Sequence, residues 1–202
     1  LNFAEKVSKK IKISKPLKGF LGGGILTAMA VIFSKQYLGL GLNTVQANLT
    51  GQQSHWYAPF MKIFFTAVTL SFGGSGGIVT PIFFIGTTSG VLFANIFGLN
   101  PATFAAIGLV SLLAGAANTP IAASIMAVEL FGVEIAPYAT VACVVSFLMT
   151  GHRSVYPSQV LAVKKSASID IETGKEMEDV VAQVNPRKES VSNFIIRFLF
   201  KK

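Results

Sequence analysis

The sequence predicts an all-α polytopic membrane protein with broken and tilted helices. Only 13% of its 202 residues are charged, about half the share usual in soluble domains, and 51% are hydrophobic. Between Ile63 and Val128 there is no Lys, Arg, Asp, Glu or His. Glycine and proline divide this stretch into pieces, several of them shorter than the roughly 20 residues of a straight transmembrane helix. Lipid rather than water is therefore the expected surrounding of this region.

The first expected membrane segment runs from Leu17 to Leu38 and is long enough to span a bilayer as one helix. A basic segment, residues 1–16, precedes it, and a polar, glycine-punctuated stretch from Gly39 to His55 follows it. Because basic segments stay on the cytoplasmic side, we expect residues 39–55 on the outer face.

Proline and glycine set the limits of the helices that follow. A glycine-rich cluster begins at Gly73, and Pro101 marks the start of another helix, because proline suits the first helical turn. The expected helices are Ala58–Phe72, Val79–Phe97, Ala102–Ala116, Pro120–Phe131 and Pro137–Gly151. Such short, interrupted helices are typical of transporters, where discontinuous helices line the binding site. Irregular backbone at membrane depth persists only where protein or a water-filled cavity covers it.

Lysine and arginine residues gather on both sides of the apolar region, which predicts that both termini face the cytoplasm. We therefore expect an even number of crossings in a multi-pass protein of the plasma (inner) membrane. Residues 17–163 form the expected membrane domain, between the basic segment 1–16 and a cytoplasmic tail, residues 164–202. The net charge of +8 does not indicate nucleic-acid binding, because the basic residues flank membrane segments without interleaved aromatic residues.

The segment from Gly73 to Pro81 carries a pattern with chemical meaning. Four glycines expose the backbone just before a helix, where unpaired N–H groups and the positive end of the helix dipole attract anions. A dipole end contributes about 0.3 to 2 kcal/mol, so an ion bound there is able to leave again. The competing interpretation is a non-transporting membrane scaffold, in which the glycines serve close helix packing alone.

Five stretches, in order along the chain, resemble the CLC family of chloride channels and anion/proton antiporters. The most specific is Gly73–Gly90, which is similar to the family's glycine-rich turn and Gly-x-Phe-x-Pro core at the start of a pore-lining helix. The others are Tyr37–Gly41, Lys62–Thr66, Phe104–Glu129 and Ser154–Tyr156. The resemblance covers about residues 16–163 and implies the C-terminal half of an inverted-repeat CLC fold.

By this resemblance, the backbone N–H groups of Ile78 and Val79 and the hydroxyl of Tyr156 would bind the central anion, chloride in the first interpretation. Without the resemblance, Tyr156 would be interpreted as an aromatic residue at a membrane interface. Val79 stands where the family usually has Phe. A fluoride-exporting member of the family is the alternative.

The resemblance also implies partners: the anion, the lipid bilayer, the missing N-terminal half of the same protein, and a second copy in a homodimer. The family's gating glutamate lies in a Gly-x-Glu-x-Pro segment, and this chain contains no such segment. The sequence therefore does not distinguish a channel from a proton-coupled antiporter, and we expect the chain alone to be inert.

No enzymatic activity, cofactor or metal site is expected. The single cysteine, Cys143, excludes an internal disulfide and a Cys-based zinc site. Glu129 is the only acidic residue deep in an apolar stretch, which makes it a functional candidate. Its position near a helix end favours the alternative, a structural role in which it accepts hydrogen bonds from backbone donors. The apolar region offers no paired carboxylates or nucleophile–base pair, so no catalytic residue is assigned.

Overall fold

The computed structural model describes residues 14–74, 76–151, 154–156, 159, 169–170 and 183–184. The expected basic segment 1–16 and cytoplasmic tail 164–202 lie mostly outside the described residues, so these two boundaries stay predictions.

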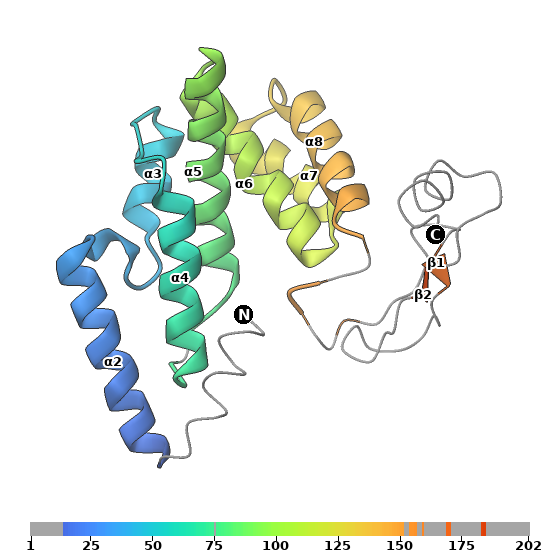
Figure 1. The fold of residues 1–202 in the computed structure, drawn as a ribbon. Helices are drawn as coiled ribbons and strands as arrows, with labels where there is room; N and C mark the ends of the chain where they lie inside the picture. Colours follow the sequence, from blue (N-terminus) through green and yellow to red (C-terminus); the bar gives the residue numbers. More distant parts are fainter. Residues whose placement is uncertain are drawn as a thin grey trace, which may run out of the picture.

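The regular elements of the described residues are all helices apart from one short strand pair (Figure 1). The helices are α2 (Lys15–Ile32), the 3-10 helix η1 (Lys35–Tyr37), α3 (Leu42–Leu49), α4 (Ala58–Ser71), α5 (Val79–Phe97), α6 (Pro101–Ala117), α7 (Pro120–Phe131) and α8 (Ala136–Met149). Strands β1 (Ile169–Asp170) and β2 (Gln183–Val184) pair antiparallel, with Ile169 opposite Val184. The predicted all-α class is confirmed.

Helices α5 and α6 form the centre of the bundle (Figure 1). Helix α5 also packs against α3 and α4, while α6 packs against α7 and α8, and α2 lies against α4. The two central helices touch through their backbones: a methyl group added to Gly86 would lie 2.6 Å from the carbonyl oxygen of Gly108. One added to Gly90 would overlap the carbonyl of Phe104. Only glycine permits so close an approach, as is common between helices in membranes.

The break between α5 and α6 follows from local sequence. Gly98 ends α5 in the left-handed conformation, with φ of 66°. Asn100 then caps α6, because its side-chain oxygen accepts a hydrogen bond from the backbone N–H of Thr103 at 3.1 Å, and Pro101 occupies the first helical turn. The predicted boundary at Asn100–Pro101 is confirmed.

The expected helix from Leu17 to Leu38 is wrong at its C-terminal end. Helix α2 stops at Ile32, because Ser34 adopts extended backbone (φ 175°, ψ 150°) and its hydroxyl accepts a hydrogen bond from the N–H of Gln36. The polar stretch 39–55 also contains a helix that was not expected, α3. Gly41, with φ of 73°, precedes α3 as its N-cap residue. Val45 and Asn48 are the buried residues of this helix.

The helices are short for a membrane protein. Among the described residues, α5 alone is long and apolar enough to cross a bilayer by itself. The other apolar helices, Pro16–Ile32, Ala58–Ser71, Pro101–Ala117, Pro120–Phe131 and Ala136–Met149, fall below that length. This pattern agrees with the prediction of broken helices that share the thickness of a bilayer.

Candidate functional site

The connection between α4 and α5 is a glycine turn and not a continuation of the helix. Helix α4 ends at Ser71, and the backbone N–H of Gly74 then donates to the carbonyl of Thr69 at 2.8 Å. Gly73 has φ of 87°, a left-handed conformation that disfavours side chains. Helix α5 begins only at Val79. The described residues between the two helices, 72–74 and 76–78, are therefore non-helical, and they lie next to the start of the longest helix in the described part of the chain.

The first turn of α5 presents backbone donors. Ile78, the residue before the helix, has no side-chain acceptor, so it does not cap the N–H groups that follow. Pro81 has no N–H, which leaves the amides of Ile78, Val79 and Thr80 at this end. These three residues are partly exposed, and Gly76 and Gly77 are exposed. The N-terminus of α5 is thus both electropositive and reachable from outside the chain.

Tyr156 lies at the same end of the α5/α6 pair as Val79. The backbone N–H of Val155 donates to the carbonyl of Ala116 at 2.8 Å, which attaches the segment to the end of α6. Helices α5 and α6 run antiparallel, with Gly86 beside Gly108, so the end of α6 corresponds to the start of α5. The Tyr156 side chain is 39% exposed. Within the described residues no hydrogen bond or ring contact joins Tyr156 to Ile78 or Val79.

Sequence reasoning missed Lys62 as a functional candidate. Its side chain is 1% exposed, although lysine is almost never buried without a partner. The ammonium nitrogen donates to the carbonyls of Gly39 at 2.7 Å and Tyr37 at 3.1 Å, and it lies 5.0 Å from the centre of the Phe84 ring. Lys62 thereby joins α4 to the turn after η1 and to α5. Its position directly before the uncharged stretch Ile63–Val128 was the sequence feature that could have indicated a role for it.

A second buried polar group ties α3 to α5. The side-chain nitrogen of Asn48 donates to the hydroxyl of Thr87 at 3.3 Å, and the hydroxyl of Ser54 donates to the side-chain oxygen of Asn48 at 2.5 Å. Both Asn48 and Thr87 are buried. This contact fixes α3 against the middle of α5, away from its N-terminus, so it positions the bundle and not the candidate site.

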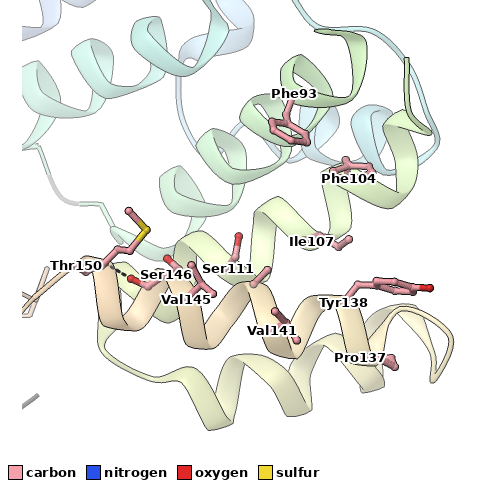
Figure 2. Close-up of a pocket in the computed structure, with 12 residues that line it drawn as sticks. Phe93, Phe104, Ile107, Ser111, Pro137, Tyr138, Val141, Val145, Ser146 and Thr150 are labelled. Atoms are coloured by element: carbon pink, nitrogen blue, oxygen red, sulfur yellow. Dashed lines mark hydrogen bonds between the residues drawn. The ribbon is translucent and has the colours of Figure 1, made fainter. Parts of the chain in front are cut away.

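A large groove lies elsewhere, between α5, α6 and α8 (Figure 2). It has a volume of about 1050 Å³, and its walls are mainly aliphatic and aromatic, with Phe93, Phe104 and Tyr138 among them. The Thr150 hydroxyl is occupied, since it donates to the carbonyl of Ser146 at 2.7 Å. A groove of this chemistry suits another apolar helix or lipid and not a small anion.

A family model decides the relationship: the model described as "Voltage gated chloride channel" matches residues 1–151. The chain belongs to this family. The family consists of channels and transporters and not of enzymes, and its fold agrees with the multi-pass membrane bundle described above.

Individual CLC relatives cover most of this chain. It is 41% identical over 159 residues to a "Chloride/fluoride channel protein" of Pseudomonas syringae pv. tomato, which covers 75% of this chain and 35% of the relative. It is 27% identical over 170 residues to the "Voltage-gated ClC-type chloride channel ClcB" of Escherichia coli K12, covering 77% of this chain and 40% of the relative.

The fold has also been seen in a solved structure. The "Crystal structure of a CLC-type fluoride/proton antiporter" superimposes with a TM-score of 0.72 at 30% identity, covering 77% of this chain and 40% of that one. The CLC chain thus spans between a third and two fifths of the length of these relatives.

Proposed function

We propose that this CLC chain forms part of a protein that moves a small anion, chloride or fluoride, across a membrane. The single observation that carries the proposal is the interruption between Ser71 and Val79, which places uncapped helical amides beside an open glycine turn. At membrane depth, such backbone is tolerated only where protein covers it or where it lines a water-filled cavity, and the open turn favours the second case.

The proposed anion ligands are the backbone N–H groups of Ile78 and Val79 and the hydroxyl of Tyr156. All three are neutral donors, so they replace part of an anion's hydration shell without the tight binding of a full charge. The attachment of Val155 to the end of α6 supports this set, because it brings Tyr156 to the end of the bundle at which α5 begins.

Fluoride should be tested beside chloride, because the relatives of this chain differ in the anion for which they are named. The names of the 41% identical relative and of the superimposed structure both include fluoride, whereas ClcB, at 27% identity, is named for chloride alone. Val79 stands where the family usually has Phe, and its smaller side chain leaves more space beside the proposed anion site. We keep chloride and fluoride as the two substrates of the proposal.

The proposal includes further partners. The relatives extend well beyond the matched region, so an N-terminal half of the same protein is proposed to complete the anion path. Exposed apolar residues on α7 and α8, such as Ile121 and Val141, suit contact with lipid or with a second copy in a homodimer. A plasma (inner) membrane location with both ends of the chain in the cytoplasm belongs to the same proposal.

The test measures efflux from liposomes that contain the full-length gene product in which this chain occurs. Electrodes selective for chloride and for fluoride record the two fluxes from matched vesicles. The informative variant is Val79→Pro, which deletes one amide donor at the first helical position, where proline is tolerated. Val79→Ala is its matched control, because it shortens the side chain and retains the N–H. Tyr156→Phe, which removes only the hydroxyl, is compared with Tyr156→Ala.

We expect Val79→Pro to reduce anion flux about tenfold or more, in line with the loss of one hydrogen bond to a charged group. Val79→Ala should change flux much less, and Tyr156→Phe should alter the ratio of the two anions. Gel filtration of each variant reports on assembly. Equal flux through the Val79→Pro and Val79→Ala proteins would exclude the proposed amide site, and absence of both fluxes in the unmodified protein would support the scaffold interpretation.

A further inference from the structure

A small cavity lies beside the glycine turn, and the proposed function does not yet use it. Its volume is about 120 Å³, comparable to the space of roughly four liquid water molecules. Its walls come from three places: the end of η1 and the turn after it (Tyr37, Gly39), α4 (Thr66, Thr69), and the segment that leads into α5 with its first turn (Gly77, Pro81). We call it the turn cavity. It is large enough for an anion that retains part of its hydration shell.

The ammonium of Lys62 lies directly behind one wall of the turn cavity. It donates hydrogen bonds to the carbonyls of Tyr37 and Gly39, and both of these residues line the cavity. A methyl group added to Gly41, the next glycine of the same turn, would lie 3.3 Å from the ammonium nitrogen. Lys62 therefore holds this wall in place and carries a full positive charge close to the cavity.

No carboxylate offsets that charge within the described residues. The sequence contains no Asp or Glu between Glu5 and Glu129, so helices α2 to α6 have no acidic side chain. Glu129 and Glu134 lie on or after α7 and are exposed, and α7 does not pack against α4. Both described hydrogen-bond acceptors of Lys62 are neutral carbonyls. A buried charge with neutral partners alone leaves a positive potential around it, which attracts anions.

We propose that the turn cavity binds a small hydrated anion and that Lys62 is its positioning residue, holding the cavity wall and supplying its positive potential. The proposal deepens the proposed function, on which it rests: the anion path would continue from the amides of α5 into the turn cavity. The class of ligand is a monovalent inorganic anion such as chloride or fluoride.

The test places a thiol in the cavity by Thr66→Cys, in the full-length gene product with Cys143 and any other native cysteine replaced by alanine. Two reagents of similar size probe it: anionic sulfonatoethyl methanethiosulfonate and cationic trimethylammonioethyl methanethiosulfonate. Each rate is divided by the rate of the same reagent with a free thiol. Gln52→Cys, at an exposed loop position, is the matched control.

We expect the anionic reagent to be favoured at Thr66→Cys by about tenfold over the cationic one, after this correction. Lys62→Met should bring the ratio to the value at Gln52→Cys, while Lys62→Arg should preserve it. Chloride or fluoride should slow the modification, and gluconate should not. Should Lys62→Met fail to fold, Lys62→Gln removes the charge and retains amide donors for the two carbonyls.

The proposal is overturned if Thr66→Cys reacts with neither reagent, if the ratio equals that at Gln52→Cys, if it survives neutralisation of Lys62, or if halide gives no protection. The rates of cysteine modification are measured without ion flux, so this test is independent of the liposome assay. A protein that passes no anion in the liposome assay contradicts the proposed function, whereas a missing charge preference in a protein that does transport contradicts the turn cavity alone.

Discussion

Glycine serves two different purposes in neighbouring parts of this CLC chain. Between α5 and α6, Gly86, Gly90 and Gly108 bring two backbones into contact, and a side chain at any of them would collide with main-chain atoms. In the turn before α5, an added methyl group at Gly73, Gly76 or Gly77 would meet nothing within 4 Å. The first group holds the bundle together, while the second keeps the helix start open.

This difference separates the two interpretations of the sequence. A scaffold would need glycines only where helices touch, as along α5 and α6. The glycines of the turn touch no neighbour at the positions where a side chain would project, apart from Gly74, which lies against Thr69. Packing within the described residues therefore does not explain the glycines at 73, 76 and 77, and the proposed function assigns them to an open approach to the amides of α5.

The largest effect is expected from Gly90→Val, which places a branched side chain where even a methyl group overlaps the carbonyl of Phe104. Because backbone atoms have no alternative rotamer, the two helices must separate, and we expect a loss of about 3 kcal/mol or more of stability. Fluorescence-detected gel filtration after heating measures the loss. A variant as heat-resistant as the unmodified protein would show that α5 and α6 are packed less closely than described.

A smaller loss is expected from Gly73→Ala. This glycine has open space around it but φ of 87°, a conformation that costs other residues about 1–2 kcal/mol. The melting temperature should fall modestly, with the protein still monodisperse. An unchanged melting temperature would mean that the turn adopts another backbone conformation in the membrane.

Gly23→Ala should raise stability slightly and serves as the control for both losses. Gly23 lies inside α2, has no atom near the added methyl group and has ordinary helical backbone. Alanine is favoured over glycine in helices by about 0.5–1 kcal/mol. Thermal unfolding in the same detergent measures the change, and a decrease would place a neighbour against this face of α2.

The smallest effect on stability, within about 0.5 kcal/mol, is expected from Gly76→Ala. The position is exposed, has no neighbour within 4 Å and does not require a left-handed conformation. Anion flux, however, should fall severalfold, because the methyl group stands beside the approach to α5. Loss of stability without loss of flux would reverse the comparison between the two groups of glycines.

Local sequence was sufficient for much of the fold. Pro101, Asn100 and the glycines at 73 and 98 act within a few residues of themselves, through a missing N–H, a capping oxygen or a left-handed backbone. The limits of α5, α6 and α7 were therefore predictable to within a residue. Helix α3 was not, because its eight residues are held by distant partners, chiefly the contact from Asn48 to Thr87.

The candidate site divides in the same way. The glycine turn before a helix start indicated an anion site from the sequence, and the resemblance to the CLC family then implied the amides of Ile78 and Val79. The 154–156 segment joins the end of α6 through a backbone hydrogen bond from Val155 to Ala116, which no local pattern predicts.

By itself, the sequence determined that this protein resides in lipid and that its helices are broken, because hydropathy and helix termination are properties of short stretches. Only the tertiary structure decided that the ammonium of Lys62 is enclosed. It also decided which glycines bring helices into contact and which leave the start of α5 open. Burial and close approach depend on which segments meet in space, and residues 37, 62 and 84 meet only after three helices have packed.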